Sequence, residues 1–316
     1  MAQMPEPPIN EGSRVGGQAV MEGVMMRGAS TWAVSVRTPE GAIRTEIGAA
    51  PEWSKRWAKV PLARGVATLA ESMSLGLRAL QWSADQQMAP EERLSKGAMG
   101  GTLAFAIVVF SAVFIVLPAL AARGLGHLLR GGFAFNLFEG GLRLAMFLGY
   151  IALIGRLPDI RRVFMYHGAE HKAIAAYERD VEMTPESAQR FSTAHVRCGT
   201  NFLLTVMVVT ILLYSVFGRP GWLLLIASRV VLIPVVAGVS YEIIRFAARN
   251  MHRHWVAFGM RPGLALQRMT TREPSLDQLE VAIASLKAVL SAAELEAVEA
   301  RLLRRPQNPG PAFGTA

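Results

Sequence analysis

The stretch GAMGGTLAFAIVVFSAVFIVLPALAA, residues 97–122, runs for 26 positions without a charged side chain. The hydrocarbon core of a bilayer is spanned by roughly 20 apolar residues in a helix, so this stretch predicts a membrane-spanning helix. Three more runs of mainly apolar residues have similar lengths: 133–155, 199–217 and 221–244. Together, the four runs predict a mainly α-helical, polytopic membrane protein with four transmembrane helices.

The composition agrees with this class of protein. Hydrophobic residues make up 52% of the 316 positions, and the mean hydropathy is +0.30. A soluble helical protein would have to bury four nearly all-apolar helices beneath a small polar remainder, which this composition does not favour. The single cysteine excludes an internal disulfide and leaves a buried thiol or a thiolate ligand as its expected role.

Four charged residues interrupt the apolar runs. Glu139 and Arg143 are spaced i,i+4, so they are expected to pair inside the helix bundle. Arg229 and Glu242 fall in the fourth run. Because a charge is costly in lipid, both are expected to face protein or water.

The basic residues that give the chain its net charge of +9 lie unevenly on the two sides of the predicted membrane spans. Lys and Arg number 11 before residue 97, 7 in 156–198 and 9 from residue 249 onward, against 2 in 123–132 and 1 at Arg219. The positive-inside rule therefore predicts a multi-pass protein of the cytoplasmic membrane, with both termini and the 156–198 segment in the cytoplasm. The expected partners are the lipid bilayer and a membrane-associated substrate or partner protein. Nucleic acid is not expected, because no RNA- or DNA-binding motif accompanies the basic residues.

The chain divides into five predicted regions. They are a disordered lead (1–12), an N-terminal cytoplasmic region (13–96), a four-helix membrane domain (97–248) with a cytoplasmic loop (156–198), a C-terminal cytoplasmic segment and helix (249–305), and a disordered tail (306–316).

Three local patterns refine this layout. Alternating residues at 32–36 and 42–47, around Pro39-Glu40-Gly41, predict a small β-hairpin, and the spacing of apolar residues in 61–86 predicts an interfacial amphipathic helix. Residues 259–274 are bounded by Gly and Pro and predict a loop. Ser275 and Gln278 form a capping box that opens the last helix.

The chemistry is concentrated in the 156–198 segment. His167 and His171 lie one helical turn apart, close enough for both imidazoles to bind one ion. With Glu170 they form H-x-x-E-H, the inverzincin pattern, in which two histidines hold zinc and the glutamate activates its water. His195 and Cys198, at H-x-x-C spacing, provide two more potential ligands. These residues predict a site for a divalent metal ion, with zinc as the expected ion.

With these residues in view, the chain resembles the YqhQ-like family of bacterial membrane proteins, a family of unknown function described as predicted metal-dependent enzymes. The matching segments are GGQAVMEGVMMRG (16–28), Arg64-Gly65, YHGAEHKAI (166–174), RCGTNF (197–202), Tyr241-Glu242 and PGLALQRMTTREP (262–274). They extend over residues 13–290. The resemblance implies that six residues from these segments line one cytoplasmic pocket: Gln18, Glu22, Arg27, Arg64, Glu242 and Gln267.

The first hypothesis is a zinc-dependent hydrolase that acts at the inner face of the membrane. His167, His171 and one of His195, Cys198 or Glu242 would hold the ion, and its bound water would have a pKa near about 7. Glu170 would take the proton from that water. Three arginines are candidates to bind a phosphate or carboxylate of the substrate: Arg27, Arg64 and Arg197.

The second hypothesis is a membrane scaffold or transport protein with a structural metal site and no catalysis. If His167, His171, His195 and Cys198 all bind the ion, no coordination position stays open, and closed tetrahedral sites are structural. In the transport form, four charged residues would line a path through the bundle: Glu139, Arg143, Arg229 and Glu242.

Overall fold

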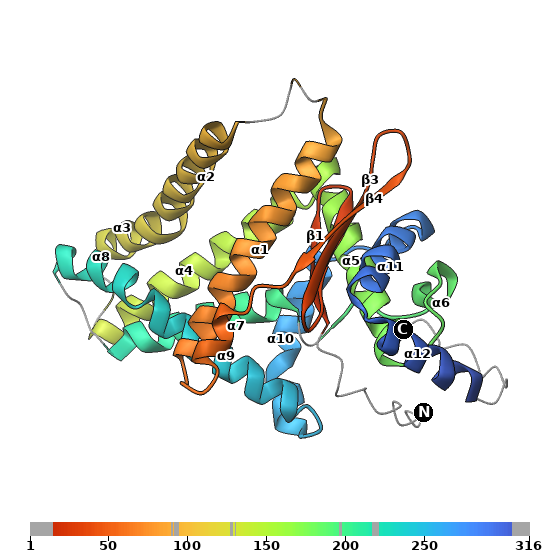
Figure 1. Cartoon of the computed structure of the whole chain (residues 1–316). Coiled ribbons are helices and arrows are strands. Elements are labelled where there is room, and N and C mark those ends of the chain that lie inside the picture. Colours follow the sequence, from red (N-terminus) through yellow and green to blue (C-terminus); the bar gives the residue numbers. More distant parts are fainter. Residues whose placement is uncertain are drawn as a thin grey trace.

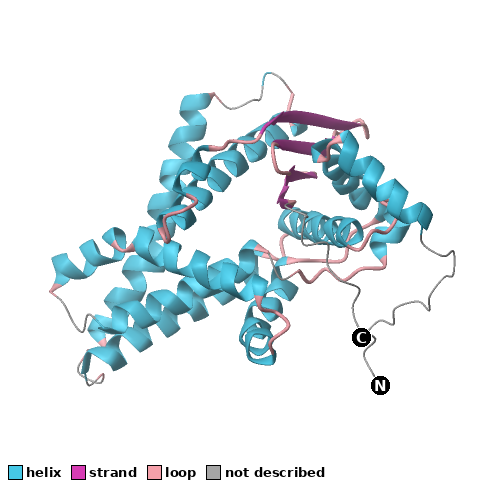
Figure 2. Ribbon diagram, turned by 60° about the horizontal axis from the view of Figure 1, so that its bottom comes forward, coloured by secondary structure: helices cyan, strands magenta, loops and turns pink. Residues whose placement is uncertain are grey.

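The computed structural model describes residues 15–89, 91, 95–126, 129, 131–195, 198–216 and 221–304. The predicted disordered lead (1–12) and tail (306–316) lie outside these residues. The chain is mainly helical, with a small sheet near its N-terminus. Figure 2 shows two parts side by side: long helices on the left, and the sheet with its covering helices on the right.

The sheet is antiparallel, with strand order β1-β2-β3-β4. Its strands are β1 (Gly16–Val20), β2 (Gly23–Arg27), β3 (Thr31–Arg37) and β4 (Ile43–Ala49). The predicted hairpin is confirmed as β3 and β4, in which Val34 lies opposite Glu46. The sequence did not indicate β1 and β2. Residues 23–26 of β2 are all buried, so this strand lacks the alternation by which half-buried strands are recognised.

Helices cover both faces of the sheet (Figure 1). One face packs on α1 (Ala63–Gln87), and Met25, Trp32 and Leu75 are buried between them. The other face packs on α5 (Pro158–Glu178) and α11 (Leu276–Val289) in one apolar core. Segments far apart in the sequence therefore share a single core.

The amphipathic helix predicted at 61–86 is present as α1, and the face that it buries in the protein consists mainly of small residues. Small residues such as Gly65 and Ala79 are buried, whereas Met73 and Leu77 are 58% and 44% exposed. Gly65 packs directly on α9 (Ile233–Arg249), because a Cβ there would lie 2.7 Å from Cβ of Tyr241. The protein-facing side of α1 is the one with small residues.

Among the described residues, three helical segments are long and apolar enough to cross a membrane. The first, Gly97–Gly124, combines α2 (Lys96–Ser111), the π-helical turn η3 (Ala112–Val116) and α3 (Leu117–Gly124). The others are α4 (Gly131–Ile154) and α7 (Gly199–Val216). At most 17% of the most apolar window of each segment is buried, as expected for surfaces in contact with lipid. These helices indicate a membrane protein.

The prediction of a fourth continuous span over 221–244 needs correction. The chain there forms two helices, α8 (Trp222–Val231) and α9 (Ile233–Arg249), of 10 and 17 residues. They are separated at Leu232, just before Pro234. Proline has no backbone N–H and its ring clashes with the preceding turn, so an apolar run that contains it need not form one straight helix.

Charged residues meet inside the helix bundle. Glu139 of α4 accepts hydrogen bonds from Arg143 (2.6 Å) and from Arg229 of α8 (2.7 Å). Arg229 also donates to Asn136 and lies 3.7 Å above the ring of Tyr214. The expected pairing of Glu139 with Arg143 and the inward position of Arg229 are both confirmed.

Glu242 does not join this charged cluster. Its carboxylate accepts a hydrogen bond of 2.6 Å from Arg64 of α1. The four charged residues predicted for a transport path therefore divide into two separate groups, Glu139 with both arginines and Glu242 with Arg64.

Glu139→Gln is expected to lower the free energy of unfolding by about 3–5 kcal/mol, because it leaves the buried Arg229 and the partly buried Arg143 without a carboxylate. Thermal or denaturant unfolding in detergent micelles would measure this loss. The matched control is Glu46→Gln, because Glu46 pairs with the exposed Arg78 on the sheet surface. Its expected cost is below about 1 kcal/mol. Equal losses of stability in the two variants would contradict the role of Glu139 as the partner of both arginines.

The C-terminal region is more helical than predicted. The predicted loop 259–274 is wrong over most of its length, because α10 (His254–Thr270) continues through Pro262. Buried packing holds this helix: a Cβ on Gly263 would lie 2.3 Å from Oδ1 of Asn201 in α7. The capping box of Ser275 and Gln278 is confirmed at the start of α11. The helix α12 (Ala292–Arg304) follows.

Candidate metal centre

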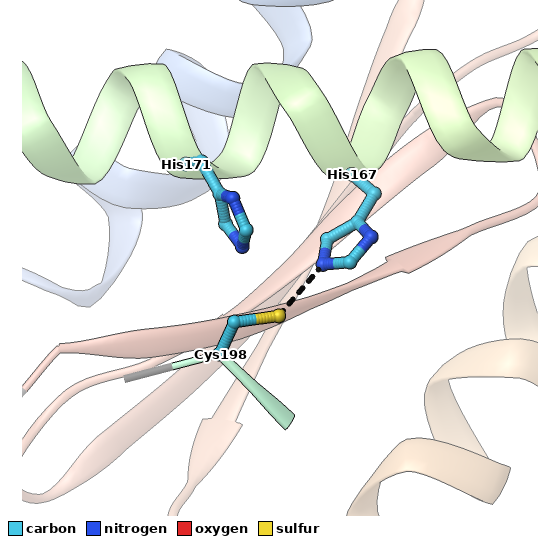
Figure 3. Close-up of side chains that lie close together, drawn as sticks. All are labelled: His167, His171 and Cys198. Carbon is cyan, nitrogen blue, oxygen red and sulfur yellow. Dashed lines mark hydrogen bonds between the residues drawn. The ribbon is translucent and has the colours of Figure 1, made fainter. Parts of the chain in front are cut away.

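Helix α5 carries the first two candidate ligands. His167 and His171 lie one turn apart on one face, and the centroids of their rings are 4.5 Å apart. His171 is buried, with 1% of its surface exposed. Figure 3 shows both imidazoles directed toward Cys198, which lies immediately before α7. The helical spacing and the long-range approach of Cys198 agree with the sequence prediction.

Main-chain carbonyls determine the tautomers of both histidines. Nδ1 of His167 lies 2.9 Å from the carbonyl oxygen of Thr270, and Nδ1 of His171 lies 2.5 Å from that of Thr193. A carbonyl can only accept, so each Nδ1 carries the proton and donates it. Each Nε2 is then unprotonated and presents a lone pair. Backbone carbonyls orient metal-binding histidines in the same way.

The three donor atoms converge. Nε2 of His167 lies 3.2 Å from Sγ of Cys198, and the candidate ligand atoms of His167, His171 and Cys198 all lie within 4.8 Å of one another. Ligand bonds of about 2.0–2.3 Å in a tetrahedron place donors about 3.3–3.6 Å apart. Nε2 of His171 is buried and has no hydrogen-bond partner among the described residues. The set of donors is one that binds zinc, and the distance between Nε2 of His167 and Sγ of Cys198 is already close to this spacing.

Burial also favours the protonation state that a ligand needs. It lowers the pKa of His171, so the neutral imidazole is favoured. Metal binding requires neutral histidine and deprotonated cysteine. A buried Nε2 with no hydrogen-bond partner among the described residues is otherwise costly.

His195 stands next to this cluster but outside it. Its ring centroid is 5.5 Å from that of His171, while its Nε2 lies 3.4 Å from a carboxylate oxygen of Glu178. Gln267 holds the backbone of His195 in both directions, accepting from its N–H at 2.9 Å and donating to its carbonyl at 2.7 Å. Of the four predicted ligands, the structure brings His167, His171 and Cys198 together and places His195 against the carboxylate of Glu178.

Glu170 is buried beside the cluster, with 5% of its surface exposed. Burial raises the pKa of its carboxyl, opposed by the charges of His167 and His195 and by the backbone N–H of Gly17. Gly17 must be glycine for this approach, because a Cβ there would lie 3.0 Å from Cδ of Glu170 and 2.7 Å from the carbonyl oxygen of Met25. The candidate base is thus in contact with β1.

The residues predicted to bind substrate are not gathered in one pocket. Arg64 pairs with Glu242 where α1 meets α9, so two of the matching family segments contact each other. Glu22 accepts a hydrogen bond of 2.6 Å from Arg162. Arg27 pairs with the buried carboxylate of Glu71. The buried Gln267 supports His195 as described above, and Arg197 lies outside the described residues.

One pocket does unite two of these residues. It has a volume of about 370 Å³ and lies between β1, β2 and α1. Gln18 and Arg27 line it, together with Gly16, Gly17, Ser72 and three apolar residues. Gly17 borders both this pocket and the carboxylate of Glu170.

The carbonyls of Thr193 and Thr270 were not predicted as part of the site. Any residue type supplies a carbonyl, so these positions carry no side-chain signal. Thr270 does lie in the segment 262–274, which the family resemblance had singled out. The structure explains that segment, because it places a hydrogen-bond acceptor behind His167.

Gly168→Ala is expected to disturb the cluster. A Cβ at Gly168 would lie 2.1 Å from the carbonyl oxygen of Arg272, so the segment that carries the Thr270 carbonyl would have to move. The expected results are a loss of about 1–3 kcal/mol in unfolding free energy and reduced metal content. Unfolding and elemental analysis of the purified variant would measure them.

Gly141→Ala in α4 is the matched control for Gly168→Ala, because its added Cβ meets nothing within 4 Å. An alanine in that helix should be neutral or slightly stabilising. Identical behaviour of the two variants would show that the contact at Gly168 is not tight.

These features define a mainly helical membrane protein in which a small sheet and its covering helices present a His–His–Cys cluster. The chain belongs to the family described as "Protein of unknown function (DUF1385)", whose model matches residues 60–292. It is 35% identical over 300 residues to "Uncharacterized protein YqhQ" of Bacillus subtilis (strain 168), covering 87% of this chain and 92% of that protein. No solved structure matches. The YqhQ-like resemblance is confirmed, and it names no reaction.

Proposed function

We propose that this protein is a zinc-dependent hydrolase of the cytoplasmic membrane, acting at the inner membrane face on a membrane-associated substrate. The observation that carries the proposal is the three-donor cluster of His167, His171 and Cys198, with His195 held apart by Glu178. Catalytic zinc sites use three protein ligands and leave a fourth position for water or substrate. Glu170, buried beside the donors, supplies the carboxylate that such a site needs.

The packing also supports four membrane crossings. The sheet, α5 and α11 share one apolar core, so they lie on the same side of the membrane. Two candidate membrane spans, Gly97–Gly124 and α4, lie between the sheet and α5 in the sequence, which gives one outward and one return crossing. After α5, the helix α7 crosses the membrane outward. Because α11 lies in the shared core, the chain must cross back before it, and α8 and α9 together would form this return crossing. Their 27 residues span about 40 Å at 1.5 Å per residue, enough for a core about 30 Å thick.

This arrangement agrees with the distribution of basic residues, which places the shared core in the cytoplasm. The surface of α1 supports contact with lipid, because Met73, Leu77 and Leu80 are exposed on it. Trp53 and Trp57 are also exposed just before this helix, and tryptophan is enriched at membrane interfaces. The site would therefore lie close to the inner membrane face.

The roles of the residues follow from their positions. A divalent ion such as Zn²⁺, held by His167, His171 and Cys198, would supply Lewis acidity to the scissile group. Glu170 would take a proton from the attacking water and deliver it to the leaving group. The carbonyls of Thr193 and Thr270 keep each Nε2 pointed at the ion. Packing on β1 excludes bulk water from Glu170.

The scaffold or transport alternative retains one supporting observation. The ring of His195 lies only 5.5 Å from that of His171, so a shift of the segment around residue 195 would close the site with a fourth ligand. A closed site would be structural. The two functions therefore differ in what they require of His195.

His195→Ala separates the two possibilities. For the hydrolase, the variant is expected to keep the zinc content of the wild type within about twofold, because His195 is not a ligand. For the structural site, it should lose zinc as completely as His171→Ala does. Elemental analysis of detergent-purified protein after dialysis against a mild chelator gives the answer. Zinc loss in His195→Ala would refute the open site.

A further inference from the structure

The end of α9 and the N-terminal half of α10 expose large aromatic side chains. Phe246 of α9 is 47% exposed, and Trp255 and Phe258 of α10 are 62% and 68% exposed. The ring centroids of Phe246 and Trp255 lie 5.9 Å apart, so the two helices share one aromatic surface. Exposed tryptophan is enriched where a membrane protein meets the lipid headgroups.

The same part of the chain is strongly basic. Residues 243–272 contain six arginines and no acidic residue. Arg249, Arg253 and Arg261 are exposed, and within the described part of the chain no carboxylate pairs with them. The guanidinium of Arg261 also lies 5.5 Å from the ring centroid of Phe258. Cations interleaved with exposed aromatic side chains are typical of a helix that lies on an anionic membrane surface.

This surface is continuous with the membrane helices. Leu266 of α10 belongs to one apolar cluster with Phe114 of the first candidate span and Phe147 of α4. Figure 1 shows the N-terminal end of α10 beside the end of α9. The exposed aromatic residues therefore border the part of the molecule that is expected to contact lipid.

α10 also reaches the candidate metal centre. Gln267 holds the backbone of His195, and the carbonyl of Thr270 accepts from His167. Phe258 and Thr270 are 12 positions apart, about 18 Å along the helix at 1.5 Å per residue. One helix therefore carries both the exposed aromatic residues and two supports of the metal centre.

We propose that the end of α9 and the N-terminal half of α10 bind the headgroups of anionic phospholipids in the inner leaflet. This α10 surface consists of Phe246, Arg249, Arg253, Trp255, Phe258 and Arg261. The inference rests on the proposed position at the inner membrane face, and it does not require hydrolysis. Guanidinium groups bind phosphate oxygens through paired hydrogen bonds, and the negative surface potential of the leaflet attracts the three cations.

Native mass spectrometry of the full-length protein in detergent tests this surface. The protein is titrated with phosphatidylglycerol, which is anionic, and with phosphatidylcholine, which has a phosphate but no net charge. The wild type should prefer phosphatidylglycerol by at least about tenfold. One variant combines Arg249→Gln, Arg253→Gln and Arg261→Gln. Its affinity for phosphatidylglycerol should fall by more than about tenfold, because each arginine near the surface contributes about fivefold.

The matched control combines Arg44→Gln, Arg190→Gln and Lys287→Gln, which remove three exposed cations elsewhere on the protein. Its affinity for phosphatidylglycerol should stay within about twofold of the wild type, because distant exposed charges are screened by salt. A loss of the same size in this control would overturn the α10 surface. Displacement of the lipid by an equal concentration of inorganic phosphate would also overturn it, in favour of a site for a soluble anion.

Fluorescence of Trp255 tests the aromatic part of the surface in reconstituted vesicles. The difference between the wild type and Trp255→Phe reports this residue alone. Phosphatidylglycerol with brominated chains should quench it more strongly than brominated phosphatidylcholine does. Quenching that is absent, or equal for the two lipids, would contradict the preference for anionic lipid.

Zinc content, measured on the same samples, keeps this proposal separate from the hydrolase. Normal zinc without a preference for phosphatidylglycerol would overturn the α10 surface and leave the hydrolase standing. Absent zinc with lipid binding that depends on the three arginines would support the α10 surface and refute the hydrolase.

Discussion

His171→Ala is expected to lower the zinc affinity of the purified protein by more than about 100-fold. Loss of an outer hydrogen-bond partner alone typically costs 10- to 100-fold, and this variant removes a ligand itself. Nε2 of His171 is buried without a hydrogen-bond partner among the described residues, so the ion is its natural partner. Competition with a chromophoric chelator would measure the affinity, and unfolding experiments would show an accompanying loss of stability.

The control for His171→Ala is His252→Ala, because His252 is exposed and far along the chain from the cluster. That variant should bind zinc as the wild type does. A wild-type affinity in His171→Ala would exclude this residue as a ligand. Equal losses in both variants would instead indicate that zinc binds at surface histidines.

Glu170→Gln is expected to retain zinc and to lose about 10²- to 10⁴-fold in turnover, the range that general acid–base catalysis contributes. Glutamine has nearly the same shape and can still accept from the Gly17 N–H, but it cannot take a proton. Purified wild type and variant would each be incubated with inner-membrane extract, and mass spectrometry would compare the products. Products that form with the wild type should be missing with the variant.

Glu280→Gln is the control for Glu170→Gln, because Glu280 is exposed and pairs with Arg37 on the surface. It should match the wild type in products and in zinc content. Full turnover by Glu170→Gln would remove Glu170 from the catalytic role. Loss of zinc from Glu170→Gln would show a structural role instead.

The sequence predicted the parts of the site that depend on local spacing. Two histidines at i and i+4 share a helix face in any α-helix, so His167 and His171 were expected to meet. The approach of Cys198 was also expected, from its H-x-x-C spacing with His195. The carbonyls that set the tautomers were not, because the Thr270–His167 contact joins residues 103 positions apart. No side-chain pattern marks such a contact.

The fold shows the same division between local and long-range information. Long apolar runs identified the membrane helices, and alternation identified β3 and β4. β2 was missed because helices cover both of its faces, which removes the alternation. The ion pairs of Arg64 with Glu242 and of Glu22 with Arg162 join residues 178 and 140 positions apart. Their partners cannot be read from spacing, so both carboxylates were placed in a shared pocket.

Zinc K-edge X-ray absorption on purified wild-type protein of known metal stoichiometry tests the central claim most directly. We expect one zinc per chain, bound by two imidazole nitrogens, one sulfur and one further light atom, with the sulfur signal lost in Cys198→Ser. Three imidazoles with one sulfur would indicate a closed, structural site. Protein purified without any transition metal, and unable to take up zinc, would contradict the account.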